Sequence, residues 1–193
     1  MALTRPAPGE WTYDDLLALP DDGRRWEIIE GVLYEMPPVS WIESATKIGL
    51  VLPFFDAVES RGGWMIVSPL WVFLPGAEPV QPDALVVLPG GGSMPSDRGL
   101  EGPPDLIVEI VSPPSRGHDL LTKRSLYARA GVREYWQIDP GARTADVLTL
   151  SGEGYRAAQH AAGNDVAHSL LLPEVTLDLA ALFARLETGP RPA

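Results

Sequence analysis

Two stretches of the chain are apolar at almost every position. They are Ala84–Leu88 and Leu106–Val111, and prolines lie just outside both. Continuous apolar runs of this length are typical of central strands that are covered on both faces. We therefore predict that both segments are strands in the interior of a sheet.

The two ends of the chain carry the signals of short helices. Thr12 can cap a short helix that stops near Pro20, because a threonine side chain readily accepts a bond from the first helical turn. Near the other end, Asp178 can cap an amphipathic helix. The apolar stripe of that helix would consist of Leu179, Leu182, Phe183 and Leu186.

Two further helices are expected between these ends. Residues 42–60 predict a helix that Pro53 would kink or weaken. Residues 118–130 predict another, which Gly131 would end. Three positions at helical spacing would form its core-facing stripe: Leu120, Tyr127 and Ala130.

The remaining strand patterns are short and separated by turns. Further strands are predicted within residues 24–36, 64–75, 133–140, 144–150 and 154–160. The first of these segments would be a hairpin with its turn at Glu30 and Gly31, and the second would break near Pro69. Residues 90–102 are rich in glycine and show no periodicity, so we predict a loop there. That loop lacks the Gly-Lys-Ser/Thr ending of a phosphate-binding loop.

These elements predict a single domain over residues 1–193, of mixed α/β (α+β) class, with helices flanking the sheet and extra β-hairpins. Residues 1–10 and 187–193 are expected to be flexible ends. Apolar residues make up 45% of the chain, which is the composition of a globular protein.

Charge and cysteine content narrow the functional classes. The chain carries 15 basic and 26 acidic residues, so its formal net charge is −11. This balance argues against loose, nonspecific nucleic-acid binding, although it leaves room for a local basic groove. The lack of cysteine excludes disulfides and thiolate metal sites and favours a cytoplasmic location. We also expect neither a signal peptide nor a membrane span, because the apolar stretches are too short.

Glu109 is out of place in the apolar run 106–111. A buried carboxylate without a partner costs several kcal/mol, or takes up a proton, unless a cation, a metal ion or a hydrogen-bond network compensates it. Lys123 is a matching anomaly, because its position falls on the core-facing stripe of the helix that follows. We therefore expect the side chains of Glu109 and Lys123 to meet.

Asp83 completes a candidate site, since it follows Pro82 at the start of the other buried strand. Two carboxylates can hold a hard divalent cation such as Mg²⁺ or Mn²⁺, which prefers oxygen ligands. A lysine beside that cation can orient the attacking water and stabilise the charge of the transition state. The trio indicates metal-assisted hydrolysis of a phosphodiester, with Asp83 and Glu109 as metal ligands and Lys123 acting on the water.

The spacing of these residues is a broken form of the PD-(D/E)XK nuclease motif. Pro82 and Asp83 match its first half, and Glu109 matches its acidic position. Val111 stands where the motif has its lysine, two residues after the acid. Lys123 could supply the amine from the following helix instead.

At these residues the chain resembles the Uma-type family of restriction endonucleases, a branch of that superfamily, over nearly its whole length. The segments that carry the resemblance are WEIIEGVLYEM, VQPDALVV, GPPDLIVEIVSPPSRGHDLLTKRSLYARAGVREYWQIDP and LLPEVTLDLAALF. The resemblance implies a restriction endonuclease-like fold and a Mg²⁺-dependent endonuclease that acts on nucleic acid, most simply DNA. It also implies a homodimer, and Glu27 as an additional ligand or supporting acid.

One position departs from the family pattern. Members of the family usually carry a histidine early in the first long helix, and this chain has Glu43 near that place. If the histidine serves catalysis or binding, the site here is altered or impaired. An alternative prediction is therefore a nuclease-fold module that binds nucleic acid or protein without turnover.

Structural roles are also compatible with the same residues. Glu109 and Lys123 could form a salt bridge without chemistry, Asp83 could bond to a turn, and Glu27 could be a solvated hairpin carboxylate. A purely structural dimer partner would show the Glu109–Lys123 ion pair with no open cavity around it.

The other polar and aromatic residues of note receive structural assignments. Asp119 would cap the helix that bears Lys123. Ser112 and Ser115 are assigned to turns rather than to nucleophiles. The remaining assignments are to the surface for His118, His160 and His168, and to the core or an interface for Tyr135 and Trp136.

Overall fold

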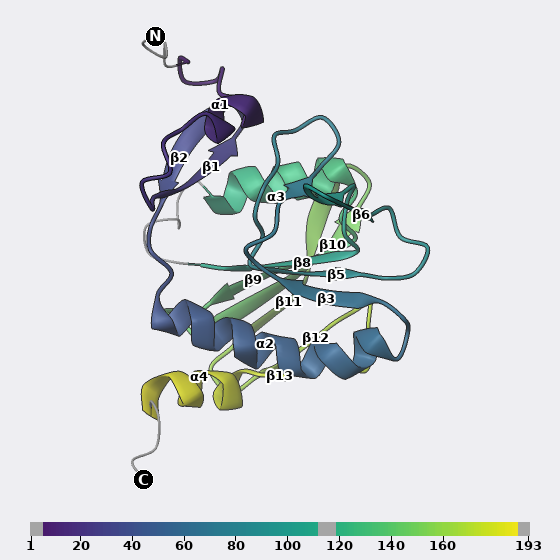
Figure 1. Ribbon diagram of the computed structural model, residues 1–193. Helices are drawn as coiled ribbons and strands as arrows, with labels where there is room; N and C mark the ends of the chain where they lie inside the picture. The colour runs from purple at the N-terminus through teal and green to yellow at the C-terminus, as the bar shows by residue number, and fades with distance from the viewer. Residues whose placement is uncertain (1–5, 112–118, 189–193) are drawn as a thin grey trace.

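The computed structural model describes residues 6–111 and 119–188. Within them, a sheet of six strands in the order β11-β10-β9-β8-β5-β3 forms the centre of the molecule (Figure 1). Its strands are β3 (Trp64–Val67), β5 (Ala84–Val87), β8 (Leu106–Ile110), β9 (Glu134–Asp139), β10 (Thr144–Ser151) and β11 (Gly154–Ala162). Strands β8 and β9 run parallel, whereas each other neighbouring pair is antiparallel. This is the mixed α/β arrangement that the sequence predicts.

Helices cover both faces of this sheet (Figure 1). Helices α2 (Trp41–Glu59) and α4 (Leu179–Thr188) lie on one face, and α3 (Asp119–Ala130) lies on the other. Because strand side chains alternate between faces, β5 and β8 contribute to two separate hydrophobic clusters. One cluster joins Phe54, Val86, Val108, Trp136 and Phe183, and the other joins Leu85, Ile107, Leu126, Tyr127 and Tyr135. Every residue of β5 and β8 is buried, as their apolar runs predict.

A separate hairpin packs beside α3 and connects the N-terminal residues to the rest of the fold (Figure 1). Its strands are β1 (Arg25–Ile29) and β2 (Val32–Met36), which pair antiparallel. The turn falls at Glu30 and Gly31, both with positive φ, as a two-residue hairpin turn requires. The carbonyl of Gly31 accepts hydrogen bonds from the N–H groups of Gly9 and Trp11. The predicted hairpin is therefore confirmed, and its position brings β1 close to the inner side of α3.

The predicted helix ends are also confirmed where the structure describes them. Helix α1 (Tyr13–Leu17) begins with a capping box between Thr12 and Asp15. The carboxylate of Asp178 accepts a hydrogen bond of 2.9 Å from the N–H of Ala181 in the first turn of α4. Gly131 follows α3 with a φ of 90°. No helix in the described part of the chain has the length and hydrophobicity that crossing a membrane requires.

One prediction about regular structure is wrong, and another is incomplete. Residues 90–102 are not only a loop, because β6 (Met94–Ser96) and β7 (Gly99–Glu101) form a hairpin there, and β7 pairs with β4 (Val72–Phe73). A further short pair was missed in part, since β12 (Val166–His168) pairs with β13 (Thr176–Asp178). These strands are very short and owe their conformation to partners elsewhere in the chain, which local periodicity does not reveal.

Candidate active site

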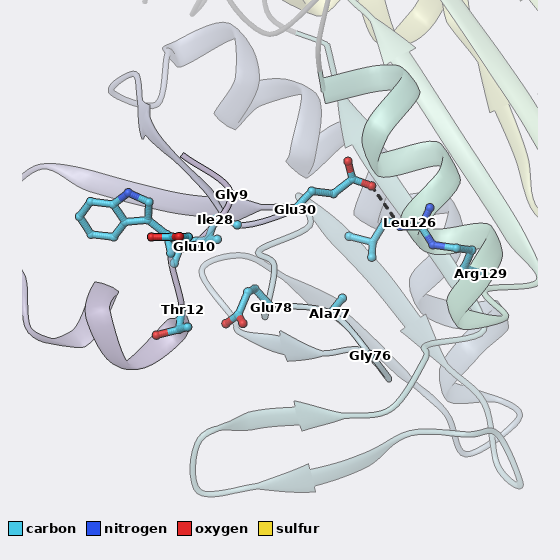
Figure 2. Close-up of a pocket in the computed structure, with 12 residues that line it drawn as sticks. Gly9, Glu10, Thr12, Ile28, Glu30, Gly76, Ala77, Glu78, Leu126 and Arg129 are labelled. Carbon is cyan, nitrogen blue, oxygen red and sulfur yellow. Dashed lines mark hydrogen bonds and ion pairs between the residues drawn. The ribbon is translucent and has the colours of Figure 1, made fainter. Parts of the chain in front are cut away.

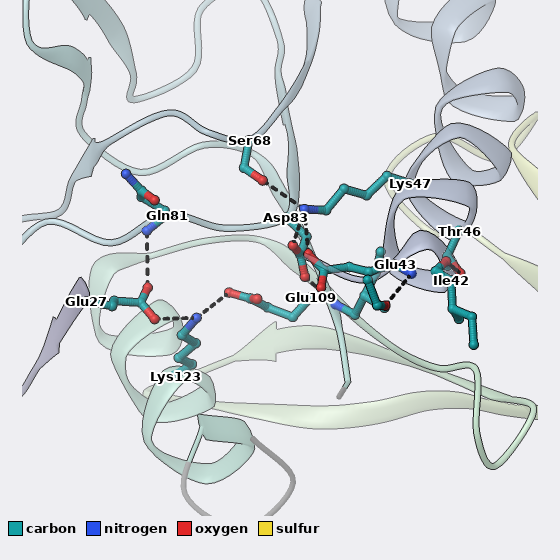
Figure 3. A network of polar contacts seen from close by, with 12 residues as sticks. Glu27, Ile42, Glu43, Thr46, Lys47, Ser68, Gln81, Asp83, Glu109 and Lys123 are labelled. Atoms are coloured by element: carbon teal, nitrogen blue, oxygen red, sulfur yellow. Dashed lines mark hydrogen bonds and ion pairs between the residues drawn. The ribbon is translucent and has the colours of Figure 1, made fainter. Parts of the chain in front are cut away.

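Lys123 lies between two carboxylates in the interior of the protein (Figure 3). Its Nζ is 3.0 Å from Oε2 of Glu27 and 3.3 Å from Oε1 of Glu109. The hydroxyl of Tyr127 donates a hydrogen bond of 2.5 Å to the same Oε1 of Glu109. Relative exposures are 2% for Glu27, 8% for Glu109 and 3% for Lys123. The prediction that Glu109 and Lys123 meet is confirmed.

Periodicity in two elements creates this contact. Val108 and Ile110 of β8 belong to the cluster beneath α2, so Glu109 between them is directed to the opposite face, where α3 lies. On α3, Lys123 and Tyr127 are one turn apart and both are buried. The predicted stripe of this helix thus faces the core at these two positions. The side chains of Asp119 and Leu120 lie outside the described part of the structure, as do residues 112–118.

Glu27 enters the cluster from the β1–β2 hairpin. Its Oε1 accepts a hydrogen bond of 3.2 Å from the backbone N–H of Gln81. Its Oε2 is ion-paired with Lys123 but accepts no hydrogen bond from any described residue. A solvated hairpin carboxylate is therefore excluded, and Glu27 supplies a buried negative charge beside Lys123.

Asp83 belongs to a second polar cluster at the start of β5 (Figure 3). Its Oδ1 is 2.7 Å from Nζ of Lys47, and its Oδ2 accepts a hydrogen bond of 2.7 Å from the N–H of Ile110. The ammonium of Lys47 also contacts Oε1 of Glu43 at 2.9 Å and Oγ of Ser68 at 3.0 Å. Asp83 is thus bonded both to α2 and to the end of β8.

The strand register makes Asp83 and Glu109 neighbours. Strands β5 and β8 are antiparallel, with Ala84 opposite Val108. Asp83 comes one residue before this pair and Glu109 one residue after it, and the Asp83 carboxylate accepts a hydrogen bond from Ile110, the residue next to Glu109. In addition to burial, the negative charge of Asp83 therefore raises the pKa of Glu109, and neighbouring carboxylates repel each other unless positive charge lies nearby. Lys123 supplies that charge on the side of Glu109.

Burial governs the ionisation of Glu109. Its removal from water raises the pKa of Glu109 to about 8, and the negative charges of Asp83 and Glu27 act in the same direction. Lys123 and the hydroxyl of Tyr127 lower that pKa without offsetting the burial. Burial, followed by the nearby Glu109 carboxylate, raises the pKa of Tyr127 well above its usual value, so Tyr127 remains a hydrogen-bond donor.

Lys47 is a residue that the sequence interpretation missed. Burial lowers its pKa, but the carboxylates of Asp83 and Glu43 more than offset this effect, so its pKa is raised and it carries a positive charge. A signal was present in the sequence: Lys47, Leu50 and Phe54 follow each other at three and four residues, and all three are buried. The same spacing argument that identifies Lys123 would have placed Lys47 on the inner face of its helix.

Glu134 shows what a purely structural buried glutamate looks like in this protein. Its two oxygens accept hydrogen bonds from the Trp136 indole, the Ser169 hydroxyl and the N–H groups of Leu170 and Leu171, at 2.6–2.8 Å. All of these donors are uncharged. Glu109 instead contacts a lysine and a tyrosine and lies near other carboxylates, an environment that is common at functional sites.

The donor atoms suit a hard divalent cation in part. Asp83 and Glu109 offer carboxylate oxygens, the ligand type that Mg²⁺ and Mn²⁺ prefer. Within residues 6–111 and 119–188, however, no group of three or more His, Asp or Glu side chains is arranged to hold a metal. Mg²⁺ is commonly bound by one or two carboxylates, with water molecules as its remaining ligands. Asp83 and Glu109 fit the ion in this way.

Cavities border the second cluster. One of about 430 Å³ is lined by residues that include Arg25, Lys47 and Ser68. Another of about 410 Å³ is lined by residues that include Glu43, Ile110 and Val111. A third, of about 550 Å³, lies between the β1–β2 hairpin and α3, where Glu30 and Arg129 form an ion pair of 3.2 Å (Figure 2). The first two are lined by residues that contact Asp83, whereas Asp83, Glu109 and Lys123 themselves line none of these three cavities.

The other aromatic residues and histidines lie where the sequence predicts them, wherever the structure describes their side chains. Tyr135 and Trp136 are fully buried in the core. His160 is exposed, with Nδ1 2.6 Å from Oδ1 of Asp146, and His168 is exposed as well. His118, Ser112 and Ser115 lie outside the described residues. The histidines that the structure describes therefore stay at the surface, as predicted.

Comparisons with known proteins agree with this fold. The model of the Uma2 family, described as "Putative restriction endonuclease", matches residues 13–180. The crystal structure of "a putative nuclease belonging to DUF820" from Anabaena variabilis is similar, with a TM-score of 0.73 and 21% sequence identity over 91% of this chain and 98% of that chain. At this identity the likeness shows the fold, a restriction endonuclease-like core. No curated protein matches the chain.

Proposed function

The chain belongs to the Uma2 restriction endonuclease family, and on that premise we propose that it is a divalent-metal-dependent endonuclease that hydrolyses phosphodiester bonds in DNA. The observation that carries the proposal is the position of Glu109, which contacts Lys123 from α3 and lies next to Asp83 on the neighbouring strand. Glu109 and Lys123 are in contact, and the strand register brings Asp83 beside Glu109.

Asp83 and Glu109 would hold the cation, Mg²⁺ or Mn²⁺, with water in the remaining positions. When bound, the cation supplies an activated water at neutral pH and neutralises charge on the phosphate. The backbone hydrogen bond from Ile110 fixes Asp83 for this role, because one of its oxygens is already oriented by the sheet. Tyr127 orients Glu109 in the same way through its hydroxyl.

Lys123 would act on the attacking water. In hydrolysis the water oxygen adds to phosphorus, the bond from phosphorus to one sugar oxygen breaks, and that oxygen takes up a proton. The ammonium of Lys123 can donate hydrogen bonds to the attacking water and stabilise the added negative charge of the transition state. Glu27 serves as its positioning residue, since it holds the lysine at 3.0 Å from the side away from Asp83.

Local charge is compatible with a polyanionic substrate even though the whole chain is acidic. The formal net charge is −11, which disfavours nonspecific binding. Arg25 and Lys47 nevertheless line one cavity next to Asp83 and present positive charge there. A phosphate that approaches through this cavity would meet cations first and the carboxylate pair behind them.

The test is a cleavage assay with purified protein. Wild type, Asp83→Asn and Glu109→Gln are incubated with Mg²⁺ or Mn²⁺ and with double-stranded DNA, single-stranded DNA and RNA, with a chelator in parallel. Asp97→Asn serves as the matched control, because Asp97 is exposed on the β6–β7 hairpin. Cleavage is expected from wild type and the control only. Equal cleavage by wild type and Asp83→Asn would mean contamination and would remove the support for the site.

A second candidate function is a nuclease-fold module that binds nucleic acid or protein without turnover. The observation that favours it is the ion pair of Lys47 with Asp83, which occupies an oxygen that a metal would need. The presence of Glu43 near the place where the family usually has a histidine also favours this candidate. Titration calorimetry with Mn²⁺ separates the candidates, because the module predicts no metal binding that depends on Asp83 and Glu109.

We also propose that the active form is a homodimer, as expected for cutting both strands of a duplex. Strand β3 is at the edge of the sheet, and Trp64 on it is 48% exposed. The neighbouring helix α2 exposes Ile48, Leu52 and Phe55 as well. Sedimentation equilibrium of wild type and Phe55→Ser tests this assignment, with a dimer expected for the former and a monomer for the latter.

A further inference from the structure

Beyond the proposed nuclease chemistry, and resting on its metal site, we infer that Lys47 is a built-in counter-ion that the divalent cation must displace from Asp83. Glu43 is the acceptor that holds the displaced ammonium. Lys47 and Glu43 thereby set how tightly the site binds metal.

The surroundings of Lys47 are those of a bound cation. Its Nζ lies within 2.7–3.0 Å of three oxygens, which belong to Asp83, Glu43 and Ser68. The residue is 9% exposed, so its charge is largely shielded from water. These oxygens come from α2 itself and from two segments distant in sequence, so the fold builds the ammonium site around one side chain (Figure 3).

A metal ion and this ammonium compete for Asp83. An Mg²⁺ ion sits about 2.1 Å from a ligand oxygen, and Lys47 already lies 2.7 Å from Oδ1 of Asp83. The two positive charges would be at most about 5 Å apart in a poorly hydrated place, where like charges repel strongly. The other oxygen of Asp83 already accepts the hydrogen bond from Ile110, so a cation bound there would have to use the second lone pair of that oxygen.

Glu43 gives the ammonium another partner within reach. It precedes Lys47 by one helical turn and already contacts its Nζ at 2.9 Å. Rotation of the lysine side chain alone would break the contact with Asp83 and keep the one with Glu43. Glu43 lines the cavity next to Val111, and Lys47 lines the cavity next to Arg25, so space exists on both sides of the pair.

Lys123 does not share this role. It is bound on two sides by Glu27 and Glu109, and it is more deeply buried than Lys47. A cation held by Asp83 and Glu109 would lie beside its contact with Glu109, but the contact with Glu27 would keep Lys123 in place. The protein therefore has one lysine that stays in the site and one that exchanges with the metal.

The experiment measures Mn²⁺ affinity by titration calorimetry and by the electron paramagnetic resonance signal of free Mn²⁺, without substrate. The proteins are wild type, Lys47→Gln, Lys47→Arg, Glu43→Gln, the double variant Glu43→Gln/Lys47→Gln, and Asp83→Asn. Thermal unfolding in chelator checks that each variant is folded. Lys47→Arg keeps the charge and provides a second variant should Lys47→Gln prove unstable.

Lys47→Gln is expected to bind Mn²⁺ about tenfold more tightly than wild type, because the competing charge is gone. Lys47→Arg should remain within about twofold of wild type, and Glu43→Gln should bind severalfold more weakly. In the double variant, the effect of Glu43→Gln should largely disappear, since it acts through the lysine.

A merely structural lysine predicts the opposite sign, because loss of Lys47 would loosen Asp83 and weaken metal binding. Equal or weaker Mn²⁺ affinity in Lys47→Gln, with Asp83→Asn abolishing binding, would overturn the inference and leave the nuclease site standing. If no protein in the series binds Mn²⁺, the proposed metal site fails first and takes this inference with it.

Discussion

The N–H of Ile110 donates a hydrogen bond of 2.7 Å to the carboxylate of Asp83. This bond lies just beyond the last ladder pair between β5 and β8 and ties the start of one strand to the end of the other. It fixes one candidate ligand by the backbone, directly beside the strand that bears the second. Preorganisation of this kind is what an electrostatic active site needs, because no reorientation is required during the reaction.

Removal of Lys123 tests whether the buried charges depend on one another. Lys123→Met leaves Glu27 and Glu109 buried without their cation, so we expect a loss of about 3–5 kcal/mol in the free energy of unfolding. Urea denaturation measures this loss. The double variant Glu27→Gln/Lys123→Met should recover part of it, because one uncompensated charge is removed. A fully stable Lys123→Met would show that the ion pairs contribute nothing.

Stability should fall with rising pH because of Glu109. Its pKa is raised to about 8 in the folded protein from an ordinary value of 4.5, so the folded state binds the proton more tightly than the unfolded state. The stabilisation is complete below pH 4.5 and is lost as the pH rises to about 8. The difference in unfolding free energy between wild type and Glu109→Gln, measured in chelator, should shift in favour of the variant over this range. If the unfolding free energies of wild type and Glu109→Gln changed with pH in parallel, the raised pKa assigned to Glu109 would be wrong.

Tyr127→Phe removes one hydrogen-bond donor without changing the shape of the core. The hydroxyl donates to Glu109 at 2.5 Å, so its loss should raise the pKa of Glu109 further and cost about 1–2 kcal/mol of stability. Cleavage should fall about tenfold, as is usual when a residue that orients a metal ligand is lost. Unchanged cleavage at pH 7 and pH 9 would mean that Tyr127 has only a packing role.

Glu134→Gln is the matched control for Glu109→Gln. Both residues are buried glutamates on adjacent parallel strands, but Glu134 binds only uncharged donors. We expect Glu134→Gln to lower the unfolding temperature while cleavage per folded molecule stays within about twofold of wild type. Glu109→Gln should abolish cleavage. Equal losses of activity in the two variants would indicate a general effect of perturbing the sheet.

The sequence predicts the centre of the fold well because its signals there are long. The apolar runs of β5 and β8, and the capped helices around them, are each specified by residues within the element. The β6–β7 hairpin is different, since Gly99–Glu101 pairs with Val72–Phe73 and has almost no pattern of its own. A strand of three residues that contains Gly or Pro can be recognised only through its partner.

The sequence predicts the part of the candidate site in which each residue is unusual within its own element. It does not predict the part that depends on how distant elements pack together. Glu109 and Lys123 are each anomalous within their own element, so one sequence suffices to connect them. Lys47 is equally anomalous beside Leu50 and Phe54, with which it shares the buried face of α2. Pro53 in the same helix makes that face harder to predict from the sequence. Its pairing with Asp83 depends on how α2 packs against the end of β5, which only the three-dimensional arrangement reveals.

The most direct test of the nuclease site is the position of Mn²⁺ in crystals of the protein soaked with MnCl₂, located by anomalous scattering. We predict a peak at about 2.1–2.2 Å from carboxylate oxygens of both Asp83 and Glu109, with Nζ of Lys47 moved away from Asp83. A peak elsewhere, or none at a Mn²⁺ concentration that supports cleavage, would contradict the assignment of these two residues as the metal ligands.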